Sequence, residues 1–281
     1  MRIINCPETM QDLALQWHQQ GLKIGLVPTM GYLHEGHISL IEAAKMECDK
    51  VIISIFVNPT QFAPNEDFAA YPRSLARDAK AAHEAGADCI FAPSDQSMYP
   101  ENYSCFVEVE NLSQVLCGKT RPIHFRGVAT VVLKLLNIVQ PHKAFFGQKD
   151  AQQFIILQQM VKDFNLQVEM RRMPIIREED GLAKSSRNIY LSEKEREEAL
   201  VLSQALQEAQ NLYQAGEENA ANIKSAMENI LQKATCGKID YLEMVDTEKL
   251  QPLKELKPPF MIALAVYIGK TRLIDNIIIE N

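Results

Sequence analysis

Short apolar runs alternate with longer amphipathic stretches over the first 175 positions. The runs that predict strands cover 23–27, 51–57, 88–92, 143–146 and 166–171. The stretches that predict helices cover 37–49, 72–85, 126–139 and 150–163. Strand, helix and strand repeated in this way predict right-handed crossovers and a mainly parallel sheet with helices on both faces. The expected fold class is therefore α/β.

The pattern changes after about residue 176. Ser192 and Glu195 have the spacing of a capping box, which predicts one long helix ending near Ala215. A second helix is expected over 218–233, and strands are expected over 239–245, 260–268 and 272–279. We therefore expect two domains, 1–175 and a smaller α+β domain over 176–281.

Composition and charge exclude several classes of protein. Lys and Arg total 29 against 36 Asp and Glu, so the net charge of −7 argues against a broad nucleic-acid contact. No apolar run approaches the ~18 residues of a membrane span, and no export signal follows Arg2, so we expect a cytoplasmic protein. The six cysteines form no CxxC pair, which makes a zinc site unexpected.

The first predicted strand leads through Pro28 into a His-x-Gly-His pattern, His34 to His37, at a helix start. Two histidines three residues apart lie on one face of a helix. Gly36 lets a phosphate approach the backbone, where the helix offers free N–H donors. The pair could hydrogen-bond a phosphoryl group during its transfer, which is the hypothesis that we favour. The alternative is that both histidines only cap the helix.

Polar residues follow two further predicted strands. Asn58 and Gln61 leave the strand at 51–57, and Lys149 and Asp150 follow Gly147. Because ligands of parallel sheets bind at the carboxyl ends of the strands, these residues are expected near the histidines. Asn-Pro alone would indicate a turn, and Asp150 could simply be a helix N-cap.

The segment Asp180–Asn188 concentrates anion donors. Lys184, Ser185, Ser186 and Arg187 follow Gly181, which could act as a hinge. Taken alone the segment could be a solvated loop. Together with His-x-Gly-His it predicts two phosphate-directed loops at one edge of the sheet.

These segments, in this order, resemble the pantoate–β-alanine ligase family of the wider His-x-Gly-His nucleotidyltransferases. The resemblance covers the whole chain: PTMGYLHEGH, SIFVNPTQF, YPR at 71–73, HFRGVATVV at 124–132, FFGQKDAQQ and DGLAKSSRN. It implies a Rossmann-like domain with a smaller C-terminal lid, and a homodimer that needs Mg²⁺. It also implies condensation of pantoate with β-alanine through a pantoyl-adenylate, with ATP cleaved to AMP and pyrophosphate.

Site residues follow from the resemblance, position by position. ATP is expected against Met30, Gly31, Tyr32, Leu33, His34, Glu35, Gly36, His37, Gly147, Gln148, Lys149, Asp150, Ile176, Lys184, Ser185, Ser186 and Arg187. Gln61 and Gln153 are expected to hold pantoate, with Gln61 also near β-alanine. His37, His34 and Lys149 are the expected catalytic residues, and His37 the acid. No protein ligand of Mg²⁺ is assigned, although Asp78 is possible by position.

Two positions depart from the family pattern. Gln148 stands where the family often has Glu, and Lys184 where many members have an apolar residue.

Three other functions compete with the one that the resemblance implies. The first competing function is another nucleotidyltransferase, which would need basic groups for a second phosphate. The second is a class I aminoacyl-tRNA synthetase, for which this acidic chain has no obvious tRNA-binding extension. The third is a non-catalytic nucleotide-binding module.

Overall fold

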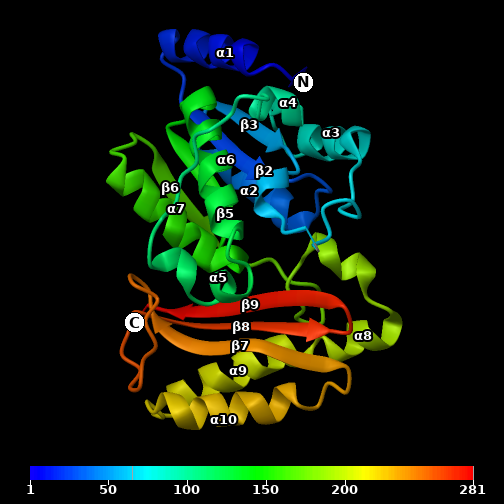
Figure 1. The fold of residues 1–281 in the computed structure, drawn as a ribbon, viewed down its shortest axis with the longest axis vertical. Coiled ribbons are helices and arrows are strands. Elements are labelled where there is room, and N and C mark those ends of the chain that lie inside the picture. Colours follow the sequence, from blue (N-terminus) through cyan, green and yellow to red (C-terminus); the bar gives the residue numbers. More distant parts are fainter. Residues whose placement is uncertain (65, 281) are drawn as a thin grey trace.

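The computed structural model describes residues 1–64 and 66–280, and Figure 1 shows their arrangement. Six parallel strands form the larger sheet, in the order β1 (Arg2–Ile4), β4 (Cys89–Phe91), β3 (Lys50–Ile55), β2 (Ile24–Thr29), β5 (Lys143–Gly147) and β6 (Glu169–Met173). After β2 the chain adds β3 and then β4 on one side of it, and later adds β5 and then β6 on the other side. The expected parallel α/β sheet is therefore confirmed.

Helices cover both faces of this sheet. One face packs against α1 (Pro7–Gln19), α6 (His124–Val139) and α7 (Ala151–Asp163), and the other against α2 (Glu35–Glu47) and α3 (Leu75–Glu84). Successive strand residues enter opposite cores: Leu26 belongs to the first and Val27 to the second. Because both faces are covered, the strands are continuously apolar.

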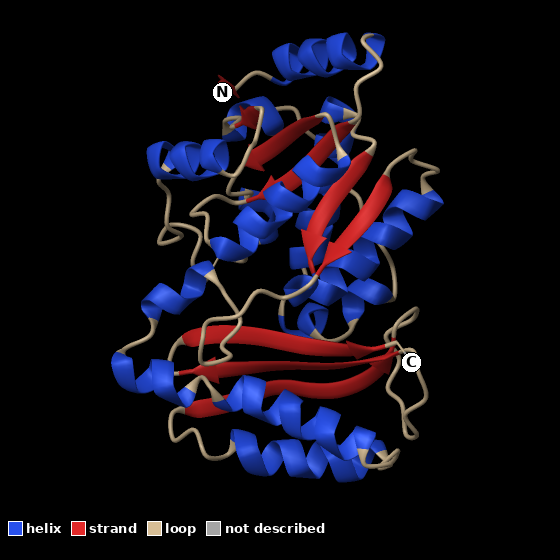
Figure 2. Ribbon diagram, turned by 180° about the vertical axis from the view of Figure 1, so that it is seen from behind, coloured by secondary structure: helices blue, strands red, loops and turns tan. Residues whose placement is uncertain are grey.

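The smaller sheet is an antiparallel meander of β7 (Gly237–Asp246), β8 (Phe260–Ile268) and β9 (Thr271–Ile279). Helices α9 (Val201–Gln214) and α10 (Ala220–Leu231) cover the face that points away from the larger sheet, as Figures 1 and 2 show. The opposite face packs against α7 and the short α5 (Cys117–Thr120). A smaller α+β unit was expected here and is confirmed.

Several boundaries differ from the prediction. The helix expected from Ser192 to Ala215 is two helices, α8 (Glu193–Glu198) and α9, separated by a turn at Ala199 and Leu200. The ψ angles of these two residues, −19° and −21°, are typical of 3₁₀ geometry. The strand expected at 166–171 is β6, shifted toward the C-terminus. The sequence pattern did not predict β1, because three residues of strand are too few to show a period, and α1 was not predicted either.

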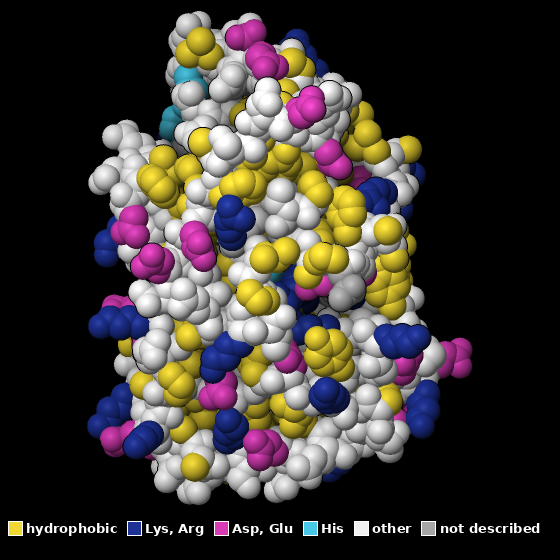
Figure 3. Space-filling model, viewed as in Figure 1, with side chains coloured by type: hydrophobic (Ala, Val, Ile, Leu, Met, Phe, Trp, Pro, Cys, Tyr) yellow, Lys and Arg dark blue, Asp and Glu magenta, His cyan; other side chains and the backbone are white. Residues whose placement is uncertain are grey.

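Surface charge is mixed over the face seen in Figure 3, where basic and acidic side chains are interspersed. In the described part of the chain, no helix has the length and hydropathy that a membrane span requires.

Candidate active site

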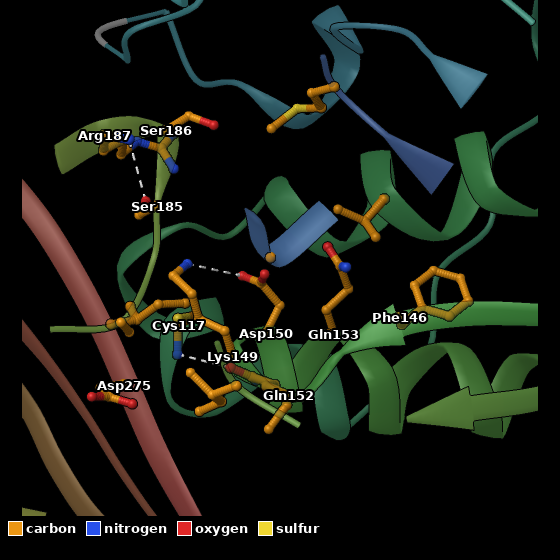
Figure 4. A pocket seen from close by; sticks show the side chains of 18 of the residues that line it. Cys117, Phe146, Lys149, Asp150, Gln152, Gln153, Ser185, Ser186, Arg187 and Asp275 are labelled. Carbon is orange, nitrogen blue, oxygen red and sulfur yellow. Dashed lines mark hydrogen bonds and ion pairs between the residues drawn. The ribbon is translucent and has the colours of Figure 1, made fainter. Parts of the chain in front are cut away.

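A cavity of about 260 Å³ opens where β2 and β5 end. From β2 the chain continues to β3 on one side, whereas β5 lies on the other side, so the strand order switches between β2 and β5. Parallel sheets bind ligands at such switch points. Both halves of the chain contribute to its walls, for example His34 and Lys149 from the N-terminal half and Asp275 of β9 from the C-terminal half. Figure 4 shows Lys149 and Asp150 on the side of the cavity opposite the segment that carries Ser185–Arg187, with Gln153 next to Asp150.

His34 and His37 cap helix α2 reciprocally. The backbone N–H of Gly36 donates to His34 Nδ1 (3.1 Å), and the N–H of His34 donates to His37 Nδ1 (3.3 Å). Since both Nδ1 atoms accept, the neutral rings carry their proton on Nε2. The capping alternative is thus observed, and it is compatible with a role in chemistry, because it leaves both Nε2–H groups as donors.

Burial and positive charge keep both rings neutral. Desolvation, followed by the charge of Lys149, lowers the pKa of His34 to about 4. Desolvation and then the neighbouring His34 and Lys149 hold the pKa of His37 well below its usual range. The two rings lie 4.0 Å apart between centroids. At neutral pH the pair therefore offers two neutral donors beside one lysine.

The loop before the histidines is fixed from α3. Asp78 is 1% exposed, and its carboxylate accepts the N–H groups of Tyr32 (2.7 Å) and Leu33 (2.8 Å). Tyr32 has a φ of 51°, in the left-handed region, which this carboxylate helps to hold. Asp78, considered above as a possible Mg²⁺ ligand, therefore already uses both oxygens to position the loop.

Gln61 lies in the short helix η1 (Pro59–Gln61) and is held by its neighbours. Asn58 Nδ2 donates to Gln61 Oε1 (3.1 Å) and to the carbonyl of Gly127 in α6 (3.1 Å). Asn58 Oδ1 accepts from the hydroxyl of Tyr99 (2.8 Å). Asn58, a candidate from the sequence, is 1% exposed and acts as the anchor for η1.

Lys149 and Asp150 lie in η3 (Gln148–Asp150), directly after β5. Asp150 occupies the N-cap position of α7, as the alternative expected, but its side chain makes no capping hydrogen bond. Lys149 Nζ lies 3.9 Å from Asp150 Oδ1. Asn276 of β9 donates to the backbone carbonyls of Gln148 (2.9 Å) and Lys149 (3.0 Å), so the smaller sheet helps to position η3.

The anion-donor segment leads into η4 (Ser186–Tyr190). Gly181 at its start has a φ of 97°, which favours glycine. Lys184 neither faces solvent nor is free, because its Nζ pairs with Glu178 (2.8 Å) and Glu35 (3.1 Å). The pair with Glu35 links the segment to the first turn of α2.

Most of the predicted site residues line this one cavity. They are Met30, His34, Gly36, His37, Gln61, Gly147, Lys149, Asp150, Gln153, Ile176, Lys184, Ser185, Ser186 and Arg187. Gly31, Tyr32, Leu33, Glu35 and Gln148 do not line it. These five belong to the loop, the helix start and the turn that carry the lining residues.

Sequence reasoning assigned no role to two lining residues near Gln61. His124 Nδ1 donates to the backbone carbonyl of Gln61 (3.0 Å), so its Nε2 is an acceptor, opposite to His34 and His37. Burial, followed by the charge of Arg121, lowers the pKa of His124 to about 3. Arg121 pairs with Glu66 through Nε (2.6 Å) and Nη2 (2.8 Å). In the sequence, only the family segment 124–132, which begins with His124, pointed to this part of the cavity.

Comparison with known proteins identifies the family. The family model described as pantoate-beta-alanine ligase matches residues 2–278. The chain belongs to the pantoate–β-alanine ligase family. This family membership makes it a ligase that forms pantothenate from pantoate and β-alanine. It also separates the chain from the three competing functions.

Relatives of this ligase match it over its full length. The pantothenate synthetase of Thermotoga neapolitana is 53% identical over 99% of this chain and 100% of its own. That of Acetivibrio thermocellus is 53% identical over the whole of both chains. The crystal structure of pantothenate synthetase from Thermus thermophilus has a TM-score of 0.94, with 41% identity and full coverage of both chains.

A further solved structure carries ligands. The pantoate-beta-alanine ligase from Francisella tularensis, complexed with Beta-gamma ATP and Beta-alanine, has a TM-score of 0.81 and 36% identity. The match covers 99% of this chain and 97% of that one.

Proposed function

We propose that this ligase uses ATP to convert pantoate into a pantoyl-adenylate, and that β-alanine then displaces AMP to give pantothenate. The observation that carries the proposal is the pair of Nε2–H donors of His34 and His37 beside Lys149 at the end of the sheet. The Francisella tularensis relative, with an ATP-type ligand and β-alanine, supports both substrates.

The phosphates of ATP bind between the two loops in this proposal. His34, His37 and Lys149 hydrogen-bond the phosphates and stabilise the charge on pyrophosphate as it leaves. Ser185, Ser186 and Arg187 add donors from the opposite wall. The proposed nucleotide contacts also include residues 30–37, residues 147–150, Ile176 and Lys184. Neutral histidines can fill this role, because each ring keeps an Nε2–H group that donates a hydrogen bond.

Pantoate binds through Gln61 and Gln153. A carboxylate is a poor electrophile, because it is anionic and has no good leaving group. Bonding it to the α-phosphorus of ATP expels pyrophosphate and creates that leaving group, which divides one difficult step into two easier ones. The amide of Gln61, fixed by Asn58, holds the pantoate oxygen in line with the phosphorus.

β-Alanine attacks second, as the free amine, from a position beside Gln61. Its nitrogen bonds to the acyl carbon, AMP leaves with the electron pair of the broken acyl–oxygen bond, and the amine loses one proton. Entry after pyrophosphate departs gives the amine access to the adenylate while the lid keeps water out.

Mg²⁺ fits this site as a companion of ATP rather than as a resident metal. Among residues 1–64 and 66–280, no group of three or more His, Cys, Asp or Glu side chains could hold a metal ion. Mg²⁺ typically takes its ligands from water, substrate phosphates and one or two carboxylates. Asp150, with a side chain that is 49% exposed at the cavity, is the carboxylate that suits it. When bound, the ion would neutralise phosphate charge.

Three broader parts of the proposal concern the whole molecule. Residues 1–175 are proposed to bind ATP and pantoate, with 176–281 acting as a lid. The resemblance to the family further supports a homodimer, which analytical ultracentrifugation would test. A cytoplasmic location, expected from the sequence, is also part of the proposal, and fractionation of cells that express the protein would test it.

Isotope transfer tests the chemical proposal. With heavy oxygen in both positions of the pantoate carboxylate, one labelled oxygen should appear in AMP and none in inorganic phosphate. Mass spectrometry of both products provides the measurement. Release of ADP, or label in phosphate, would establish an acyl-phosphate route and overturn the adenylate mechanism.

A further inference from the structure

Arg187 of η4 is held by a carboxylate from a distant part of the chain. Its Nε and Nη2 donate to Oδ2 and Oδ1 of Asp67, each at 3.0 Å. The two residues are 120 positions apart in the sequence. Their side chains are 29% and 27% exposed, so the pair is largely shielded from solvent. This parallel, two-bond geometry fixes the plane of the guanidinium group as well as its position.

The geometry of the pair leaves donors for a second anion. Arginine has five N–H groups in a rigid fork, and Asp67 uses one on Nε and one on Nη2. The remaining three, two on Nη1 and one on Nη2, form the other edge of the group. Arg187 lines the cavity, whereas Asp67 does not. The carboxylate therefore supports the guanidinium from behind and does not occupy the cavity.

The segment that carries Asp67 is itself braced. Arg73 donates to the carbonyls of Phe68 (2.9 Å) and Tyr71 (2.9 Å), which closes the loop on itself. Phe68 packs on Phe62 with ring centroids 5.4 Å apart. A second bond joins the same two segments, because the hydroxyl of Tyr190 donates to the carbonyl of Ala70 (3.2 Å). Asp67 is thus a fixed point of attachment for Arg187.

We propose that Asp67 is a positioning residue for ATP, which orients Arg187 so that its free edge meets the phosphates. The inference rests on the proposed role of Arg187 as an ATP ligand. The opposite hypothesis is that Asp67 competes with phosphate for Arg187. That hypothesis predicts tighter ATP binding once the carboxylate is removed, so the sign of the effect separates the two.

The test is Asp67→Asn, which keeps the size of the side chain and replaces one acceptor with a donor. We expect the KM for ATP, and the dissociation constant of a non-hydrolysable ATP analogue, to rise about tenfold, with the KM for pantoate within twofold of wild type. Loss of one charge-assisted hydrogen bond has this magnitude. Glu47→Gln is the matched control, because Glu47 also accepts from an arginine, Arg171 (2.6 and 3.0 Å), and neither of these two residues lines the cavity. This control should leave the KM for ATP unchanged.

A double-mutant cycle shows whether Asp67 acts through Arg187. In an Arg187→Ala background, Asp67→Asn should change the KM for ATP less than twofold. An unchanged or lower KM for ATP in the single variant, or a full tenfold effect in the Arg187→Ala background, would overturn the inference. An unchanged KM in Arg187→Ala alone would instead refute the proposed role of Arg187 itself. Thermal unfolding of each variant, with Asp67→Ser as a second substitution, separates lost binding from lost folding.

Discussion

Gly127 is the position where a single methyl group should disturb the site most directly. It lies in α6, where a Cβ would come 2.4 Å from the backbone carbonyl oxygen of Thr60 and 2.6 Å from Cα of Gln61. Ordinary contacts of a Cβ begin at 3.4 Å, so Gly127→Ala must move η1 by about 1 Å. The atoms that obstruct it belong to the backbone, which cannot rotate away.

The magnitude follows from two opposing effects. Overpacking costs up to about 3 kcal/mol, and we expect the upper value because backbone must shift. The higher helix propensity of alanine returns about 1 kcal/mol. The free energy of unfolding should therefore fall by about 2 kcal/mol, which corresponds to a decrease of roughly 5 °C in Tm.

The catalytic effect should exceed the loss of stability. A displacement of about 1 Å at a group that orients substrate can cost on the order of 100-fold in rate. We expect kcat/KM for pantoate to fall about 100-fold in Gly127→Ala, measured at saturating ATP, with the dissociation constant of ATP within threefold of wild type. The pantoate defect follows because Gln61, and not the histidine loop, is displaced.

Gly147→Ala provides the control for stability. A Cβ at Gly147 would have no atom within 4 Å, and its φ of −79° suits any residue. This variant should unfold like wild type. If Gly127→Ala kept both its Tm and its kcat/KM for pantoate, close packing of α6 on η1 would not be what positions Gln61.

Three further predictions concern the histidines and the lid. His37→Ala and His34→Ala should each slow single-turnover formation of the adenylate by two to three orders of magnitude, since a lost preorganised donor costs about 3–4 kcal/mol. A near-normal rate for His37→Ala at saturating ATP would exclude His37 from the mechanism. The pKa of His34 is about 4 in the folded chain, against about 6.5 in the unfolded chain. Between pH 6.5 and pH 4 the unfolded chain therefore binds more protons, and the free energy of unfolding falls as the pH is lowered through this range. His34→Asn, which can still cap α2, should lose less stability than wild type between pH 7 and 5 in urea titrations, and an equal loss would refute this assignment. Hydrogen exchange across 181–190 should slow when ATP and pantoate bind, because the lid becomes ordered, and unchanged exchange would argue against closure.

The sequence predicted those parts of the fold whose hydrophobic pattern is local. Strands β2, β3 and β5 are each evident as apolar runs, and the polar residues at their carboxyl ends meet at one edge as parallel pairing requires. The break after α8 was missed because Ala199 and Leu200 are good helix formers, and no glycine or proline marks the turn.

The site was predictable where its residues follow strand ends or where anion donors cluster in the sequence, as in Lys184–Arg187. Asn276 lies in the middle of β9, and nothing in its neighbourhood indicates that its amide reaches the carbonyls of η3. Asp67 likewise lies in a loop without a period, and its pairing with Arg187 depends on how the two halves meet. Contacts of this kind depend on tertiary structure, which a single sequence does not encode as a pattern.

The two hydrogen bonds from Asn276 to η3 bear on whether the N-terminal half of this enzyme can bind ATP by itself. A chain cut near residue 175 would keep all six parallel strands and both histidines, yet the carbonyls of Gln148 and Lys149 would lose their donors. The apolar surface of α5 and α7 that β7 and β8 cover would also face water. The N-terminal half is thus expected to be a poor autonomous ATP-binding module. Insertions, fusions and split-protein designs should spare the contact between η3 and β9.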